Sequence, residues 1–128
     1  MQLATVQREA QRVSAMRTAF GLGALLAPGL LGRIFGISGR QDVASARFMT
    51  RLWGVRELAL AAATVQGAGQ AATLERTVRL NLAVDAADAA SSLPALLRRE
   101  GLDRAALMTV AFGLVGAAGW ARLLRALA

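Results

Sequence analysis

The chain has 128 residues and a formal net charge of +7; 55% of its residues are hydrophobic and 18% are charged. This length allows a single domain, and the high hydrophobic content excludes intrinsic disorder. The absence of cysteine, histidine and tyrosine excludes disulfides, thiolate metal sites and the most common general base. We therefore expect a non-enzymatic protein that needs neither a metal nor another cofactor.

The positive charge comes entirely from arginine, and the 15 arginines are spread along the chain from Arg8 to Arg125. A basic protein of this kind invites the hypothesis of a soluble helical bundle that binds nucleic acid. Aromatic residues, however, make up only 5% of the chain, too few for a surface on which bases stack. Anionic lipid headgroups explain the same surplus of charge, so we expect a lipid bilayer rather than nucleic acid as the partner.

The first predicted element comprises residues 1–17. Its apolar residues recur at helical spacing between polar ones: Leu3, Val6, Ala10 and Val13. This pattern predicts an amphipathic helix that lies on a membrane surface or, alternatively, a solvated helix leading into the first span. We expect a domain boundary after it, with residues 18–128 forming a second unit.

Residues 18–128 contain four apolar stretches, at about 18–37, 48–66, 72–97 and 105–127. Alanine and leucine fill their interiors and β-branched residues are sparse, so we predict helices rather than strands. Glycine-containing segments near Gly36, Gly69 and Gly101 separate the stretches and mark the expected turns. The expected fold is all-α: an antiparallel four-helix transmembrane bundle with an amphipathic N-terminal helical extension.

The fourth stretch carries the strongest indication of a membrane span. Residues 105–121 include no charge and no polar face, whereas a helix of a soluble bundle shows one. Small residues suit close packing of this helix in lipid: Gly113, Gly116, Ala117 and Ala121. Trp120 is expected at the depth of the lipid headgroups. Arginines flank the stretches on both sides, so the positive-inside rule barely favours a cytoplasmic N-terminus.

Charged residues interrupt the second and third stretches, and we predict that they form a buried charge network together with one asparagine: Arg51, Arg56, Glu57, Arg79, Asn81, Asp85 and Asp88. Ionisable groups at membrane depth are costly, so they face the interior of a bundle and pair with one another. Asn81, Asp85 and Asp88 lie on one stripe of a helix, together with Ser92.

The partners in this network follow from the expected hairpin. If the second and third helices form a hairpin that turns near Gly69, Arg51 lies at the same depth as Asp88, and Arg56 lies at the same depth as Asp85. We therefore predict these two ion pairs. Glu57 competes for either arginine or for Arg79. Gly54 allows another backbone to approach closely. The network either fixes the register of the helices or forms a site for an ion, a proton or a small ligand.

The pattern R-x-x-G-x-R-[DE], formed by Arg51, Gly54, Arg56 and Glu57, is followed by the aspartate pair Asp85 and Asp88. With these motifs the chain resembles a family of small bacterial four-helix integral membrane proteins of unknown function. The resemblance implies a multi-pass protein of the bacterial inner membrane and implies no activity.

Two functions are compatible with a membrane bundle. The first is that of a non-enzymatic accessory or interaction subunit, whose partners are other membrane subunits or a second copy of the chain. The second is a transporter-like or ligand-binding bundle that uses the buried arginines and aspartates.

Overall fold

The computed structural model describes residues 3–128, and within them every element is helical. It contains five α-helices, α1 (Leu3–Leu26), α2 (Pro28–Ile34), α3 (Ala44–Gly67), α4 (Ala71–Arg98) and α5 (Asp103–Leu127), with a short 3₁₀ helix η1 (Gly39–Gln41) before α3. The prediction of an all-α fold is confirmed. The last three long helices match the second, third and fourth apolar stretches, whereas the first stretch comprises the end of α1, which begins much earlier, and all of α2.

Helix α1 includes residues 3–17 of the segment that we expected as a separate amphipathic extension, whose residues 1–2 lie outside the described residues. The boundary expected after residue 17 therefore lies inside one continuous helix. Val6 and Ala10 are fully buried, in a cluster with Leu74 and Val78 of α4. The sequence indicated the correct apolar face but not its partner, because the same face can cover lipid or another helix. This face of α1 is part of the core, so the prediction of an extension that lies on the surface is wrong.

The first apolar stretch is broken at Pro28. Proline disfavours helical geometry in the residue before it, and Ala27 leaves the helix with φ −138° and ψ 59°. Helix α2 consequently turns away from α1 by 120°. The chain then passes through Gly36 and Gly39, both with positive φ, at the turn that the sequence predicted. The first stretch is thus a bent pair of helices rather than one straight span.

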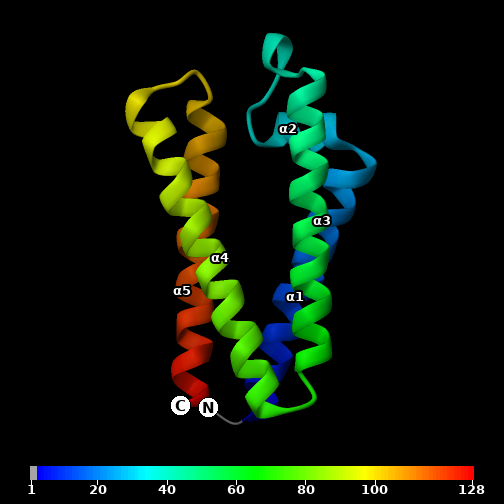
Figure 1. Ribbon diagram of the computed structural model, residues 1–128, viewed down its shortest axis with the longest axis vertical. Coiled ribbons are helices and arrows are strands. Elements are labelled where there is room, and N and C mark those ends of the chain that lie inside the picture. Colours follow the sequence, from blue (N-terminus) through cyan, green and yellow to red (C-terminus); the bar gives the residue numbers. More distant parts are fainter. Residues whose placement is uncertain (1–2) are drawn as a thin grey trace.

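The long helices form two closely packed pairs, α1 with α3 and α4 with α5. The pairs meet near the chain termini and the α3–α4 turn, and they diverge toward the α4–α5 turn (Figure 1). Glycines allow the close approach within each pair. A Cβ atom at Gly54 would lie 2.8 Å from the carbonyl oxygen of Gly21, and one at Gly113 would lie 2.6 Å from that of Asp85. Gly54 and Gly113 thus have the packing role predicted for them.

Among the described residues, α5 alone is long and apolar enough to cross a membrane, or α1 with α2 as well if that bent pair is one span. The most apolar window of α5 has a mean hydropathy of 1.6, and only 17% of it is buried inside the protein. The outer faces of the other helices also expose large apolar side chains, among them Leu26, Leu52 and Leu97. Length and composition therefore support fewer spans than the four expected.

Candidate functional site: a buried charge network below a cavity

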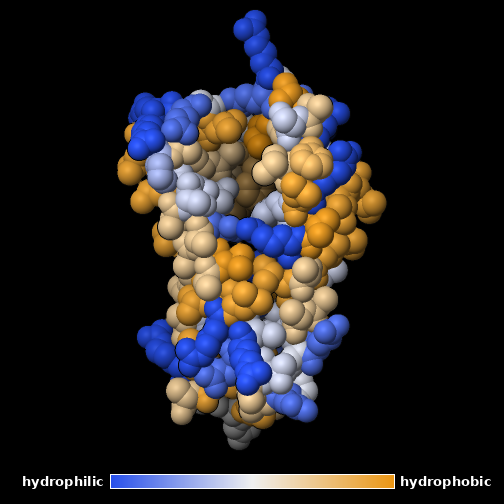
Figure 2. All heavy atoms as spheres, viewed as in Figure 1, coloured by the Kyte–Doolittle hydropathy of each residue, from blue (hydrophilic) through white to orange (hydrophobic). Residues whose placement is uncertain are grey.

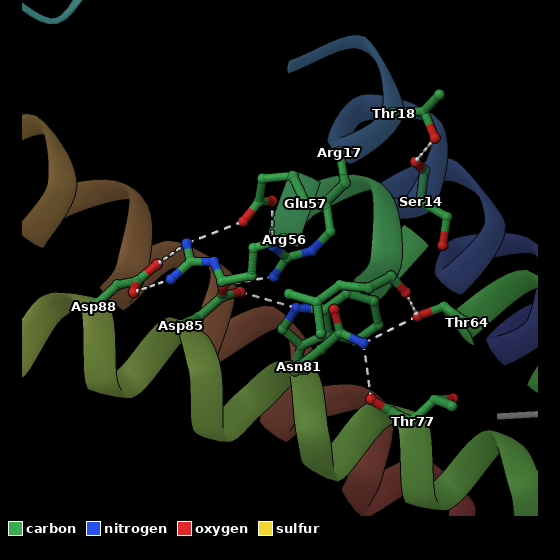
Figure 3. Close-up of polar contacts among 12 residues, drawn as sticks. Ser14, Arg17, Thr18, Arg56, Glu57, Thr64, Thr77, Asn81, Asp85 and Asp88 are labelled. Carbon is green, nitrogen blue, oxygen red and sulfur yellow. Dashed lines mark hydrogen bonds and ion pairs between the residues drawn. The ribbon is translucent and has the colours of Figure 1, made fainter. Parts of the chain in front are cut away.

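Arg17 of α1 is the centre of the charge network and is only 7% exposed. Its Nη1 atom donates a hydrogen bond to Oε2 of Glu57 in α3, and its Nη2 atom donates to Oδ1 of Asp85 in α4 at 2.5 Å (Figure 3). Hydrogen bonds between ionised groups are about twice as strong as neutral ones. One arginine therefore links three helices.

Arg17 is absent from the predicted network, because it ends the polar N-terminal segment that was expected outside the bundle. The available signal was the spacing of the buried residues of α1, which continues without interruption through the arginine: Val6, Ala10, Ser14, Arg17, Gly21 and Ala24. Steps of three and four residues keep all of these positions on one face of a helix. An arginine on that stripe must face the interior.

Arg56 forms the second half of the network. Its Nη1 and Nη2 atoms donate to the two carboxylate oxygens of Asp88 at 2.7 and 2.6 Å, and Nη2 also donates to Oε1 of Glu57 at 3.1 Å. Glu57 is 4% exposed and thus bridges the two arginines. Such paired contacts exploit the planar fork of a guanidinium group.

Trp120 extends the network to the fourth long helix, α5. Its Nε1 atom donates to Oδ2 of Asp85 at 2.9 Å, and the Cζ atom of Arg17 lies 5.9 Å from the centre of its ring. The side chain is 1% exposed. Trp120 therefore faces the interior of the bundle rather than the lipid headgroups, because the indole N–H has a buried carboxylate as its partner.

The two predicted ion pairs are also corrected. Arg56 binds Asp88 rather than Asp85, whereas Arg51 is exposed and does not contact Asp88. Pairing at equal depth requires that α3 and α4 pack along their whole length, but they diverge from their turn, and an arginine from a third helix binds Asp85. The structure thus brings together Arg56, Glu57, Asp85 and Asp88 of the predicted set.

Arg79 and Asn81 lie outside this network. Arg79 pairs with Glu75 at 2.6 Å on the exposed face of α4, so its expected place in the network is wrong. Asn81 is fully buried, but its Nδ2 atom donates to Oγ1 of Thr64 at 2.9 Å and to the carbonyl oxygen of Thr77 at 2.8 Å. Asn81 therefore forms a separate polar contact between α3 and α4, one helical turn from Asp85.

Two glycines of α5 make room for the network. A Cβ atom at Gly116 would collide with the carboxylate of Asp85, and one at Gly113 would collide with the backbone of the same residue. Ala117 and Ala121, the other predicted packing positions, are half-buried on α5. The small residues thus position the indole of Trp120 and the carboxylate of Asp85 on facing helices.

A cavity of about 920 Å³ lies between the two helix pairs, on the side of the network toward the α4–α5 turn. Its walls are mainly apolar and include the rings of Phe20, Phe35, Trp53 and Phe112, whose neighbouring centroids lie 5.8 to 6.2 Å apart. Figure 2 shows this hollow, with hydrophobic atoms on its walls and a row of hydrophilic atoms below it. Arg17, Glu57, Asp85 and Asp88 form the charged floor.

At the end of the cavity near the α4–α5 turn, the two helix pairs contact each other. The Nε2 atom of Gln41 donates a hydrogen bond to the carbonyl oxygen of Gly101. The side chain of Arg104 fills the space next to Gly36, where a Cβ atom would lie 2.6 Å from its Cδ atom. The two pairs are therefore joined at both ends, with the cavity between the joints.

Comparisons with known protein families, with curated proteins and with solved structures find no match for this chain. Within residues 3–128 no group of three or more acidic side chains is arranged to hold a metal ion. The oxygens of Glu57, Asp85 and Asp88 instead accept hydrogen bonds from arginine and tryptophan. The site is thus a cavity with a charged floor.

Proposed function

We propose that this chain is a small integral membrane protein whose helix bundle binds a small, largely apolar molecule in the cavity between the two helix pairs. The cavity itself is the observation that carries the proposal. Its volume of about 920 Å³ is within the range of ligand pockets, which combine apolar walls with a few placed polar groups. The role is that of a ligand-binding or transporter-like bundle rather than an enzyme.

The distribution of charge supports a membrane location. Residues 105–121 of α5 carry no charge, and at 1.5 Å per residue they cover about 25 Å, close to the ~30 Å of a bilayer core. Near the chain termini and the α3–α4 turn lie Arg8, Arg12, Arg76, Arg79, Arg122 and Arg125. Near the opposite end lie Arg33, Arg40, Arg47, Arg98, Arg99 and Arg104. Two arginine-rich ends around a band whose outer faces are apolar apart from Arg51 favour insertion as a multi-pass protein. The sequence motifs imply that the membrane is the bacterial inner membrane.

The rim of the cavity indicates how a ligand enters. Met16, Met49 and Val115 line the cavity, which is open at its rim, and each is more than half exposed. In a bilayer these residues contact lipid tails. An apolar ligand can therefore reach the cavity from the membrane, without passing through water.

The role of accessory subunit has less support. Exposed apolar side chains such as Leu22 and Leu114 suit contact with another subunit, but lipid tails cover the same surface equally well. Surface contact with another subunit does not require the cavity, whereas ligand binding does. The network serves the ligand-binding role and also fixes the packing of the four long helices.

The proposal is tested first by fractionation and then by ligand binding. The protein should stay in the membrane fraction after an alkaline carbonate wash, and the purified protein in uncharged detergent should bind the neutral probe N-phenyl-1-naphthylamine.

Ala46 lines the cavity, whereas Ala62, on the same helix, is exposed outside it. We expect Ala46→Trp to weaken binding at least tenfold and Ala62→Trp to leave it unchanged. Equal binding by both variants, or recovery of the protein without detergent, would refute the proposal.

A further inference from the structure

We propose that the cavity selects lipophilic cations, that is, molecules carrying one positive charge surrounded by aromatic or aliphatic groups. This inference rests on the proposed ligand-binding function and specifies the chemical class of the ligand. Its basis is the combination of a negatively charged floor with aromatic walls in one partly open cavity.

The first observation is the formal charge of the network. Two arginines, Arg17 and Arg56, face three carboxylates, Glu57, Asp85 and Asp88, so the ionised network carries one surplus negative charge. A buried charge without a counter-charge is costly. A cation bound above the floor supplies that counter-charge.

The second observation is which of these groups line the cavity. The three carboxylates of the network and Arg17 line the cavity, whereas Arg56 does not. Glu100, near the α4–α5 turn, adds a fourth carboxylate to the lining. Both Nη atoms of Arg17 already donate to Glu57 and Asp85. Among the described residues, Arg17 is the one arginine that lines the cavity, and its Nη atoms face carboxylates while its buried Nε has no partner. Four carboxylates against one guanidinium make the surface that a ligand meets negative.

The third observation is the aromatic wall. Phe20, Phe35, Trp53 and Phe112 lie around the same space and contact one another edge-on or at a tilt. The faces of aromatic rings attract cations, and the attraction is stronger when water is excluded. An anionic ligand of the same shape would meet negative ring faces and a negative floor, and would bind more weakly.

The experiment compares two ions of the same shape. Tetraphenylphosphonium and tetraphenylborate each carry four phenyl groups around one central atom, and they differ in the sign of their charge. Binding to the purified protein in uncharged detergent is measured by equilibrium dialysis, with empty micelles as the blank. We expect the phosphonium ion to bind at least tenfold more tightly than the borate ion. Equal binding, or tighter binding of the borate, would overturn the inference.

The same measurements separate this inference from the proposed function. If N-phenyl-1-naphthylamine binds but the phosphonium ion shows no preference over the borate, selectivity for cations is wrong and the ligand-binding role remains. If none of the three compounds binds, both are wrong.

Variants of the network test whether its charge is responsible. Asp88→Asn removes the surplus negative charge and should lower affinity for the phosphonium ion at least tenfold. Combining it with Arg56→Gln restores the surplus, so the double variant should regain affinity. Glu75→Gln is the matched control, because it also removes an arginine-paired carboxylate from α4 but outside the cavity. If Asp88→Asn does not fold, the folded double variant provides the test. If the double variant bound the phosphonium ion no more tightly than the borate ion, the inference would be refuted.

Discussion

The Nη2 atom of Arg17 lies 2.5 Å from the Oδ1 atom of Asp85, which is 68 residues further along the chain. Asp85 in turn accepts a hydrogen bond from Trp120 through its other oxygen. Each side chain comes from a different helix, and the remaining long helix, α3, joins through Glu57. The packing of the bundle and the floor of the cavity therefore depend on the same few groups.

The first prediction concerns Arg17. Replacing it with methionine leaves Glu57 and Asp85 buried without their main counter-charge, and breaking a buried ion pair in this way typically costs about 3–5 kcal/mol. We expect Arg17→Met to lower the free energy of unfolding by about that amount, measured by denaturant titration in detergent.

Arg12→Met is the control for this change. Arg12 pairs with Glu9 on the exposed side of the same helix, and surface pairs contribute little. Its effect should therefore be small. If both variants unfolded at the same denaturant concentration, the central role of Arg17 would be wrong.

The second prediction compares two glycines of α5. A Cβ atom at Gly116 would overlap the carboxylate of Asp85, whereas one at Gly119 would meet no atom within 4 Å. Gly116→Ala should therefore destabilise the fold by about 1–3 kcal/mol. Gly119→Ala should be neutral or slightly stabilising, because alanine favours helix. Thermal unfolding of both variants measures the difference, and the reverse order of stability would contradict the packing described here.

The third prediction tests the membrane location through two exposed leucines. Leu114 lies near the middle of α5 and Leu97 near the end of α4, and both are more than half exposed. An arginine at the centre of a span costs about 2.5–3.5 kcal/mol on insertion scales, whereas one near the end can reach the headgroups. Leu114→Arg should lower the amount of protein in the membrane fraction much more than Leu97→Arg does. In a water-soluble bundle the two changes would be tolerated alike.

The fourth prediction concerns pH and a pair outside the helical core. Arg47 donates to both carboxylate oxygens of Asp42, at 2.8 and 2.9 Å. These hydrogen bonds and the charge of Arg47 lower the pKa of Asp42. A carboxyl group whose pKa is lowered by folding stabilises the fold above its unfolded pKa of about 3.9, and this contribution disappears as the pH falls through the folded value.

Comparison with Asp42→Asn isolates that contribution, because all other carboxyl groups are common to both proteins. At pH 6 the unaltered protein should have the higher melting temperature, and the difference should shrink steadily below pH 4. A difference that stayed constant down to pH 2 would show that the Asp42 charge is not responsible.

Much of the helical fold could be predicted from the sequence, because long runs of alanine and leucine and the glycines between them act locally. The turn near Gly69 and the break near Gly36 are examples. The bend at Pro28 was visible as a proline, but its angle depends on how α2 packs. The continuation of α1 through residue 17 was missed, because the polar residues around Val6 and Ala10 concealed an apolar face that packs on α4.

The composition of the site was predicted better than its pairing. Glu57, Asp85 and Asp88 were expected to be buried, because charges inside apolar stretches must face the interior. Their partners depend on how far α3 and α4 diverge and on an arginine from a third helix, and no local pattern specifies either. The cavity also results from that divergence, so it could not be predicted from single helices.

The order in which the chain is synthesised separates Arg17 in time from the residues that it binds. Its guanidinium is made first, and its partners follow 40 and 68 residues later. At about 5–20 residues per second, the last partner emerges several seconds after the arginine. If the chain inserts into a membrane as proposed, a lone cation is not stable among lipid tails, so α1 would stay at the aqueous boundary until the later helices arrive. Assembly is therefore completed only after most of the chain has left the ribosome.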